Sequence, residues 1–226
     1  MKNKLIIFGI GETASTIFEY FKYDSNFEII GFTAHKKYIS NNILNKLPIF
    51  PFEDFIFNIN PKEIYLFPAL SYTQLNKDRT EIFSLAKKHG FKIPSFISSK
   101  SYVSPSAKIG DGVFIYDNVS INHNCIINDN TIICSGSVIS HSTVIGKNSF
   151  IAPNCSIGGF VKLGNNCFIG IGSTIVDKID LMDKVLLSAG SVLYNSANYS
   201  NIYKGNPAKD TGLDSEQFIS LNGEIS

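Results

Sequence analysis

Residues 139–156 read ISHSTV, IGKNSF and IAPNCS, three consecutive six-residue repeats that each begin with isoleucine. The same register puts a large aliphatic side chain at every sixth position from residue 103 to residue 193. A helix would space apolar residues at about 3.6 and a half-buried strand at about 2, so this period indicates neither. It indicates a solenoid whose coil has three short sides, each presenting one aliphatic side chain inward. The sixteen residues in this register are Val103, Ile109, Ile115, Ile121, Ile127, Ile133, Ile139, Ile145, Ile151, Ile157, Leu163, Ile169, Ile175, Leu181, Leu187 and Leu193.

A second register, four residues after each aliphatic, holds small or β-branched side chains that suit the tight corners of such a coil. Its members are Ala107, Val113, Val119, Cys125, Thr131, Ser137, Thr143, Ser149, Cys155, Val161, Cys167 and Ser173. Glycine or asparagine directly follows several of the aliphatics, and we interpret these positions as turns with left-handed backbone angles. They are Gly110, Asn128, Gly146, Gly158, Gly164 and Gly170.

The composition is that of a globular protein without a polyelectrolyte partner. The chain has 226 residues, of which 44% are hydrophobic and 17% charged, and its net charge is +1. So balanced a charge does not favour a nucleic-acid polymer or an anionic membrane surface as partner. The N-terminal apolar run stops at Gly11 without a signal-peptide cleavage pattern, and no run is long enough to cross a bilayer. We interpret the four cysteines as reduced packing residues, which predicts a cytoplasmic protein.

Before the repeats, short apolar runs alternate with helical patterns, which is typical of a doubly wound α/β domain of the Rossmann-like type. The segment 36–54, with Pro48 and Pro51, is rich in loop residues and leaves room for one short edge strand. The sequence predicts strands at 4–10, 27–33, 63–69 and 93–97, and helices at 12–22 and 74–89. The predicted domains are 1–98 (α/β), 99–194 (parallel β-helix of hexapeptide repeats) and 195–226 (C-terminal loop and tail).

The turn after the first predicted strand, FGIGETAS, contains Gly9 and Gly11. Glycines there would let a phosphate or ribose approach backbone N–H groups at a helix start. Only the first two glycines of the dinucleotide fingerprint are present, and FTAHKK follows the second strand, where an acidic residue would bind the ribose. The pattern favours a mononucleotide group over a whole dinucleotide, although many such turns use glycine for geometry alone.

Two histidines, His123 and His141, stand two residues after a core aliphatic, where side chains point outward. Three six-residue sides complete one coil, so His123, His141 and Gly159 form one column with a spacing of about 4.8 Å. An unhindered Gly159 N–H could point at an oxygen beside the His141 imidazole, which is the geometry of a general base with an oxyanion donor. The alternative interpretation is two surface histidines at a turn, and for His123 the two are equally favoured.

The repeats and the closing GNPAK, residues 205–209, resemble the acyl-CoA-dependent acyltransferases of the hexapeptide superfamily, whose fold is a left-handed β-helix. With the preceding α/β domain, the chain resembles bacterial nucleotide-sugar acyltransferases, both the sialic acid O-acetyltransferase type and the N-acyltransferases of amino-dideoxysugars. The segment FPALSYTQLNKDRTEIFSLAKKHGFKIPSFIS, with Asn76 and Arg79, is similar to the N-terminal domain of the latter. The resemblance covers nearly the whole chain and specifies fold and acyl transfer better than the acceptor.

The resemblance implies roles for individual residues of this chain. His141 matches the catalytic base, and Gly159 matches the amide that meets the acyl carbonyl oxygen. Gly9 and Gly11 match the turn that holds the nucleotide of the sugar substrate, with Asn76 and Arg79 as further substrate-binding residues, while His123 stands where we expect acceptor contacts. The residues that match the coenzyme A groove are Gly170, Gly172, Gly205, Pro207, Ala208 and Lys209.

The chain departs from the family pattern at two positions. Many members have an acidic residue after the catalytic histidine to orient it, and this chain has Ser142. Many also have a second histidine, which donates to the acyl carbonyl, where this chain has Phe150. The first departure predicts that His141 is less strongly activated or is oriented by a backbone carbonyl, and the second predicts a transfer that depends more on backbone groups.

The expected function is therefore N-acylation, with acetyl-CoA or another acyl-CoA as co-substrate and a dTDP-, UDP- or GDP-linked amino-dideoxysugar as acceptor. Such transferases serve the biosynthesis of lipopolysaccharide O-antigen, capsule or other surface glycans. An amine that is already partly neutral needs a weaker base than a hydroxyl does, which favours N-acylation here. Sugar O-acetylation of the sialic acid type and a non-catalytic hexapeptide scaffold stay open as alternatives.

Two other classes of enzyme that contain this coil fit the sequence poorly. A zinc hydrase would need three histidines, and the repeats contain only His123 and His141, so no metal is expected. A sugar-nucleotide pyrophosphorylase would need a catalytic domain much larger than residues 1–98.

The resemblance also implies a homotrimer with the coenzyme groove between subunits. Apolar residues that point outward from the coil and need cover agree with this assembly. These are Phe114, Ile126, Ile132, Val138 and Val144.

Overall fold

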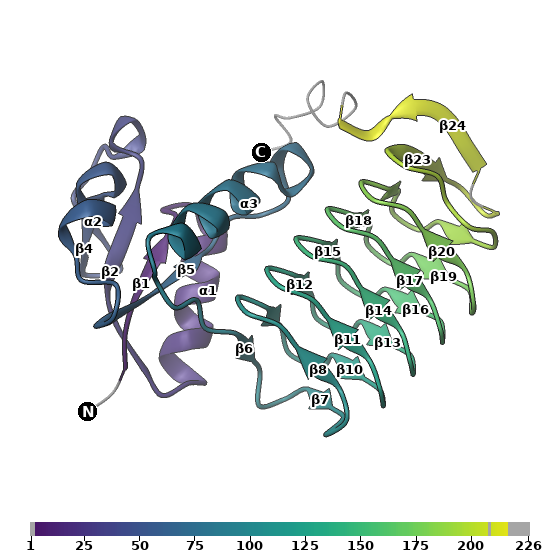
Figure 1. Ribbon diagram of the computed structural model, residues 1–226, viewed down its shortest axis with the longest axis horizontal. Coiled ribbons are helices and arrows are strands. Elements are labelled where there is room, and N and C mark those ends of the chain that lie inside the picture. Colours follow the sequence, from purple (N-terminus) through teal and green to yellow (C-terminus); the bar gives the residue numbers. More distant parts are fainter. Residues whose placement is uncertain (1–2, 208, 217–226) are drawn as a thin grey trace. The chain divides into compact units, whose positions relative to one another are not determined.

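The computed structural model describes residues 3–207 and 209–216. The chain divides into two compact units, Met1–Ser71 with Asp78–Phe96, and Tyr72–Lys77 with Ile97–Ser226. The first is the α/β unit and the second is the β-helix unit (Figure 1). Within the described residues, no helix has the length and apolar character that crossing a membrane requires.

The α/β unit is a sheet with strand order β3-β4-β2-β1-β5, in which β4, β2, β1 and β5 run parallel. β1 is an interior strand, between β2 and β5, because its apolar run, LIIF at its carboxyl end, is buried. The strands are β1 (Asn3–Phe8), β2 (Phe27–Ala34), β3 (Ile43–Leu44), β4 (Leu47–Pro51) and β5 (Ile64–Pro68). The helices are α1 (Glu12–Tyr23), the short 3-10 helix η1 (Lys36–Tyr38), α2 (Phe52–Asn58) and α3 (Thr73–Lys88).

The chain order of the parallel strands reverses beside β1, because β2 and β4 follow on one side and β5 on the other. In open α/β sheets, ligands bind at such a switch point, outside the carboxyl ends of the strands. The Gly9–Gly11 turn follows β1 at this place. The Ala69 N–H donates to the Phe8 carbonyl (2.8 Å), which closes the end of β5 onto β1.

Two expectations for the α/β unit are wrong and one is incomplete. The segment 36–54 contains the expected short edge strand, β3, and also β4. It continues into an unpredicted helix, α2, because Phe52, Phe55 and Ile56 form a buried helical face behind Pro51. The strand expected at 93–97 is reduced to a single bridge between Tyr65 and Lys92, and Phe96 and Ile97 form β6 in the β-helix. The helix expected from residue 74 is interrupted, because Gln74, Leu75 and Asn76 have left-handed backbone angles.

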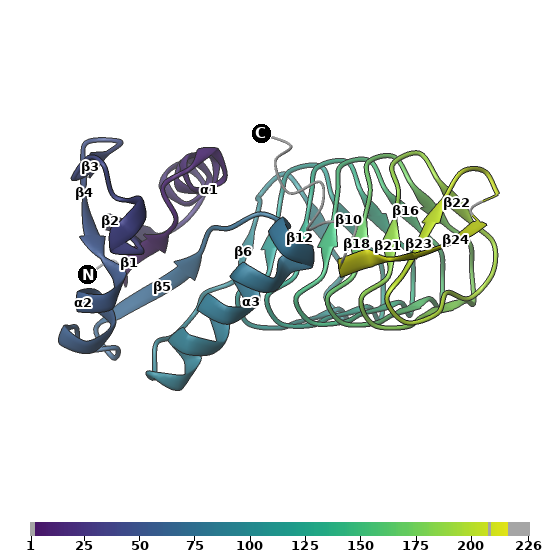
Figure 2. The same ribbon diagram turned by 90° about the horizontal axis from the view of Figure 1, so that it is seen from above.

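The β-helix unit confirms the hexapeptide register. Strands eighteen residues apart pair in parallel, as in Ile121 with Ile139 and Ile139 with Ile157, so the coils stack as Figures 1 and 2 show. Fourteen of the sixteen aliphatics are buried, and only Val103 and Ile109, in the first coil, are half-buried. The strands are β7 (Tyr102–Val103), β8 (Lys108–Ile109), β9 (Phe114–Ile115), β10 (Ser120–Ile121), β11 (Ile126–Ile127), β12 (Ile132–Ile133), β13 (Val138–Ile139), β14 (Val144–Ile145), β15 (Phe150–Ile151), β16 (Ser156–Ile157), β17 (Lys162–Leu163), β18 (Phe168–Ile169), β19 (Thr174–Ile175), β20 (Asp180–Leu181), β21 (Leu186–Leu187) and β22 (Val192–Leu193).

These strands form three sheets, one for each side of the coil. We name them by their outer strands: the β7–β22 sheet, the β8–β20 sheet and the β6–β24 sheet. The last of these begins with β6 (Phe96–Ile97) and continues beyond β21 with β23 (Asn201–Lys204) and the antiparallel β24 (Lys209–Asp214). This architecture is the parallel β-helix that the repeats predict, with the left hand that the resemblance implies.

The turn glycines have a different role from the one the sequence suggested. Left-handed angles occur three residues after the aliphatic, not directly after it, at positions such as Gly112, Asn118 and Asn124. Glycine directly after the aliphatic is needed for space. A Cβ on Gly164 would lie 2.6 Å from the Asp183 nitrogen, one coil away, so a side chain there would push the coils apart.

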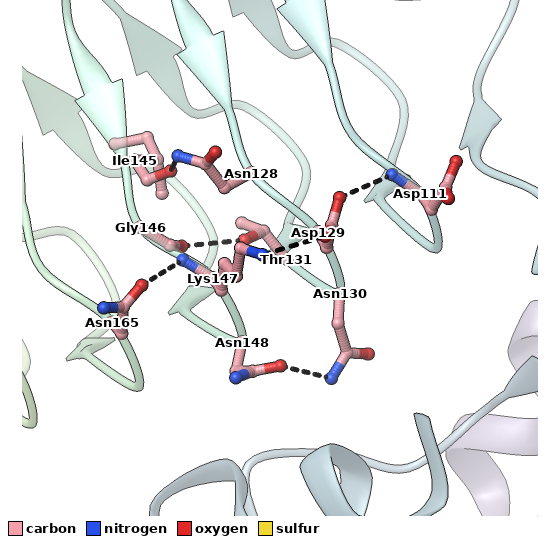
Figure 3. Close-up of polar contacts among 10 residues, drawn as sticks. All are labelled: Asp111, Asn128, Asp129, Asn130, Thr131, Ile145, Gly146, Lys147, Asn148 and Asn165. Carbon is pink, nitrogen blue, oxygen red and sulfur yellow. Dashed lines mark hydrogen bonds and ion pairs between the residues drawn. The ribbon is translucent and has the colours of Figure 1, made fainter. Parts of the chain in front are cut away.

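Polar side chains cap the backbone from one coil to the next at the corners (Figure 3). The Asp111 N–H donates to Asp129 Oδ1 at 3.0 Å, and the Lys147 N–H donates to Asn165 Oδ1 at 2.8 Å. The Asn165 N–H donates in turn to Asp183 Oδ1 at 2.8 Å. Each acceptor stands eighteen residues after its donor, so these corner bonds help to hold adjacent coils in register.

The outer face of the β6–β24 sheet is apolar, and the segment Tyr72–Lys77 lies against it. The Tyr72 ring lies 5.2 Å from the Phe150 ring and 4.6 Å from the Phe168 ring, measured between centroids. The Phe150 and Phe168 rings stack on each other with their centroids 5.8 Å apart. Leu75 packs with Leu186 and Ile202, and Phe168 borders the same cluster. Because residues 74–76 form a left-handed turn, the side chains of Tyr72 and Leu75 both contact the coil.

Candidate active site

The turns that link the β7–β22 sheet to the β8–β20 sheet carry the candidate catalytic residues, and we call this edge the histidine corner. It contains His123, His141 and Gly159 in successive coils, as the eighteen-residue spacing predicts. The imidazole rings of His123 and His141 stack with their centroids 5.3 Å apart and an interplanar angle of 14°. Backbone bonds fix the column, because the Ser142 N–H donates to the His123 carbonyl (2.9 Å) and the Phe160 N–H to the His141 carbonyl (3.0 Å).

The His141 imidazole is half-buried and lies directly over Gly159. A Cβ on Gly159 would be 2.8–3.2 Å from three atoms of the His141 ring, so only glycine leaves room for the ring in this position. Among the described residues, none hydrogen-bonds to the His141 ring nitrogens. Its neighbours are aromatic: His123 on one side and Phe160, perpendicular to it at 82° and 5.0 Å. Neither ring nitrogen of His141 is therefore engaged by a hydrogen bond within the described residues.

The expectation of an unengaged Gly159 N–H is wrong. This N–H donates to Asp177 Oδ1 at 2.6 Å, the same corner bond that Asp129 and Asp183 make elsewhere in the coil. The sequence places Asp177 one coil after Gly159, which is the signal that could have revealed it. As the structure stands, a carboxylate occupies the position from which an acyl oxygen would accept this hydrogen bond.

Asn76 and Arg79, expected as substrate-binding residues, have buried side chains that serve the protein's own backbone. Asn76 Nδ2 donates to the Cys167 carbonyl at 3.3 Å, and Arg79 Nη1 donates to the Ser71 carbonyl at 2.9 Å. Their role in substrate binding stays a prediction. Phe150, where the resemblance leads us to expect a histidine, is likewise buried, beneath the Tyr72 ring.

The residues expected to hold coenzyme A lie at a different edge of the coil, the turns that link the β6–β24 sheet to the β7–β22 sheet. Gly170 and Gly172 belong to one such turn, and Gly205 lies two coils further along. A Cβ on Gly170 would lie 2.5 Å from the Ala189 nitrogen, while Gly172 and Gly205 have φ values of +66° and +94°. Pro207 follows a cis peptide bond, Lys209 begins β24, and Ala208 lies outside the described residues. We call this edge the glycine corner.

The turn after β1 has the geometry expected for an anion or ribose. Gly9 has φ +125°, and a Cβ there would lie 2.7 Å from the Ala69 carbonyl oxygen, so glycine is required. Gly11 is the N-terminal cap of α1 and has open space around it, with no side chain that caps the helix. The first N–H groups of α1 have no intrahelical acceptor, and the helix dipole favours negative charge there.

An acidic group that the sequence did not predict lies beside the end of β2. Glu53, from α2, accepts hydrogen bonds from His35 Nδ1 (2.8 Å) and from the Lys36 N–H (3.1 Å), directly after β2. Hydrogen bonds, from its own backbone N–H first and then from His35, lower the pKa of the Glu53 carboxyl, which keeps it ionised. A carboxylate from another segment thus lies beside the end of β2, where FTAHKK itself contains none, and short-range sequence patterns do not reveal it.

The described residues contain no group of three or more His, Cys, Asp or Glu side chains that could hold a metal ion. The four cysteines are buried, and none of them forms a disulfide. Burial raises the pKa of Cys125, that of Cys155 to about 11 and that of Cys167 to about 12. Since the thiolate is the reactive form, these thiols are packing residues and not nucleophiles.

Comparison with known proteins agrees with this architecture. Residues 91–202, almost wholly within the β-helix unit, match the family model described as the GMPPB C-terminal domain. PerB from Caulobacter crescentus, solved in complex with CoA and GDP-perosamine, is 23% identical, with a TM-score of 0.81 over 92% of this chain and 97% of its own. The acetyltransferase domain of PglB from Neisseria gonorrhoeae is 21% identical, with a TM-score of 0.81 over 92% of this chain and 99% of that one. The chain has their fold.

WeeI from Acinetobacter baumannii is a more distant match, 17% identical with a TM-score of 0.57 over 91% of this chain and 98% of its own. At these identities the likeness establishes the fold, an α/β unit followed by a left-handed β-helix.

Proposed function

We propose that this chain is an acyl-CoA-dependent N-acyltransferase that acylates an amino group of a nucleotide-linked amino-dideoxysugar. The observation that carries the proposal is the His141 imidazole, held over Gly159 with neither ring nitrogen hydrogen-bonded within the described residues. The similar PerB was solved with CoA and GDP-perosamine and the PglB domain with acetyl coenzyme A, which supports acetyl-CoA as donor. The products would serve surface glycans such as lipopolysaccharide or capsule, made in the cytoplasm.

In this reaction the sugar amine attacks the thioester carbonyl, a C–N bond forms and the C–S bond breaks. His141 accepts the proton that the amine loses, and coenzyme A leaves and ends as the free thiol. A neutral imidazole is suited to this near pH 7. His141 has no acidic partner to strengthen it, and a sugar amine, partly neutral already, needs less help than a hydroxyl. This favours N-acylation over O-acylation.

We propose that the nucleotide binds at the switch point of the α/β sheet. The N-terminal N–H groups of α1, next to Gly11, would receive a phosphate. The ionised Glu53 would accept a hydrogen bond from a ribose or base donor. The choice among dTDP, UDP and GDP would then depend on groups around Glu53 and His35.

We propose that the acyl carbonyl oxygen accepts a hydrogen bond from the Gly159 N–H and in doing so displaces the Asp177 carboxylate. Asp177→Ala removes the competing carboxylate, and we expect it to raise kcat/KM for acetyl-CoA by about tenfold. A hydrogen bond to a charged group contributes on the order of 1.5–3 kcal/mol, and about 1.4 kcal/mol corresponds to a factor of ten. The measurement is steady-state kinetics of acetyl-CoA consumption.

The control is Asp183→Ala, which removes the equivalent bond to the Asn165 N–H (2.8 Å) at another corner of the coil. We expect no rise in rate for this variant. Equal rates for the two variants, or a loss in both, would assign Asp177 to coil stacking alone and would move the oxyanion donor away from Gly159.

We propose a homotrimer, because one chain places its candidate base at the histidine corner and its candidate coenzyme residues at the glycine corner. A neighbouring copy can bring the two kinds of corner together. Of the outward apolar residues, Phe114 and Ile132 are already buried in the single chain, whereas Val138 is 38% exposed and Ile126 and Val144 are half-buried. We expect light scattering at micromolar concentration to give three times the 25.0 kDa chain mass, and a monomer would refute this assembly.

The direct test of the function is release of free thiol from acetyl-CoA in the presence of nucleotide-linked amino sugars, GDP-perosamine among them. Buried cysteines with raised pKa values give the folded protein little thiol background of its own. Acceptor-dependent thiol release, with an N-acetylated product by mass spectrometry, supports the proposal. No release with any amino sugar, but release with the matching hydroxyl sugars, would favour the O-acetyltransferase alternative.

A further inference from the structure

Phe160 stands at a turn position whose backbone suits other residues. Its φ is +59°, and the equivalent turn residues elsewhere in the coil are mostly asparagine or glycine. Asparagine and glycine tolerate left-handed angles, whereas a bulky aromatic residue there is unusual. The equivalent residues are Gly112, Asn118, Asn124, Asn130, Gly136, Ser142, Asn148, Asn154, Asn166, Gly172, Lys178, Lys184 and Gly190.

Burial does not explain the phenylalanine. Its side chain is 50% exposed, so it gains only part of the free energy that a buried ring would contribute. Among the described residues, its one ring contact is with His141, at 5.0 Å and 82°. An unfavourable backbone conformation that brings an exposed ring to one particular side chain indicates a role for that side chain.

His141 needs such a neighbour, because no acidic side chain orients it. Ser142 follows it in the sequence, and no described residue hydrogen-bonds to its ring nitrogens. Perpendicular and stacked aromatic contacts are favourable and directional. Phe160 and His123 therefore limit the rotation of the imidazole from two sides, while Gly159 lies beneath it.

We infer that Phe160 is a positioning residue, which holds the His141 imidazole in the orientation for proton transfer in place of an acidic partner. This inference rests on the proposed function, and it assigns the orienting task to an aromatic edge instead of a carboxylate. The acceptor amine and the thioester would meet His141 on the side that Phe160 leaves open.

The decisive variant is Phe160→Asn, because asparagine suits the left-handed turn and removes the ring. We expect its melting temperature to equal or exceed that of the wild type, while kcat falls at least tenfold and KM for acetyl-CoA changes less than about twofold. Phe160→Tyr keeps the ring, and we expect it to retain kcat within about twofold. A purely structural role would not produce a stable but slow Phe160→Asn enzyme.

Lys178→Asn is the matched control, since Lys178 is an exposed residue one coil further along the same corner, with φ +60°. It should gain the same backbone preference and keep the wild-type kcat. The inference is overturned if Phe160→Asn keeps the wild-type kcat, or if the two asparagine variants lose activity equally.

An NMR readout separates this inference from the proposed function. The ring current of Phe160 should shift the His141 ring-proton resonances, and Phe160→Asn should move them while Lys178→Asn leaves them in place. If the wild type transfers no acyl group to any acceptor, the proposed function fails, and unmoved resonances would show that Phe160 does not hold His141 either.

Discussion

His141→Ala is expected to lower kcat by about 10²–10⁴-fold, the usual loss when a general base is removed. The variant should fold, because His141 makes no side-chain hydrogen bond within the described residues and its ring is half-buried. Its affinity for coenzyme A, measured by calorimetry, should be unchanged, since the candidate coenzyme residues lie at the glycine corner. The loss should therefore appear in turnover and not in binding.

The pH dependence provides a second criterion for this variant. If a substrate amine arrives already neutral, raising the pH should partly restore the activity of His141→Ala, because hydroxide and solvent take over proton removal. Near-normal turnover of His141→Ala from pH 6 to 9 would refute His141 as the base. The assay compares the turnover rates of His141→Ala and the wild type over this pH range at saturating acetyl-CoA.

His123→Ala is the matched variant, since the two rings stack in the same column. We expect a smaller fall in kcat from His123→Ala, through looser packing of His141, together with a higher KM for the acceptor. A larger effect at His123 than at His141 would place the base one coil earlier than we propose.

The coil could be predicted in detail because its period repeats one local rule many times. Each repeat places an aliphatic side chain where only an inward position is favourable, so the register is fixed by sixteen independent choices. The α/β unit was harder to predict. Its missed helix, α2, depends on Phe52, Phe55 and Ile56 finding a sheet surface that only the folded unit provides. The left-handed turn at Leu75 likewise depends on contacts with Leu186 and Ile202.

The candidate site likewise has a part that the repeat predicts and a part that depends on contacts between distant segments. The column of His123, His141 and Gly159 follows from an eighteen-residue period, so arithmetic on the sequence predicts it. The carboxylate on the Gly159 N–H follows from the same arithmetic, and the corner bond between Asp111 and Asp129 shows that it is a general feature of the coil. The Glu53–His35 pair joins residues from different elements, and no local pattern in the sequence predicts it.

Ile145→Asp is expected to abolish soluble folding. The Ile145 side chain is completely buried, and its neighbours in the adjacent coils are Ile127 and Leu163, which offer an aspartate no hydrogen-bond donor. The loss of a buried isoleucine costs about 1.5–3 kcal/mol, and a buried polar group without a partner adds several kcal/mol more. A domain has only about 5–15 kcal/mol of stability, so the two costs together remove most of it.

Ser156→Asp is the control, because Ser156 occupies the outward position beside Ile157 on an equivalent strand and is exposed. A carboxylate there stays in water, so the melting temperature should change by only a few degrees. The measurement is the soluble yield and the circular-dichroism melting curve of the two variants. A well-folded Ile145→Asp protein would mean that this side chain can leave the interior, which requires a strand to slip by one residue. Such a slip would turn every inward side chain of that strand outward, and the stacked isoleucines make this the least favourable arrangement of the coil.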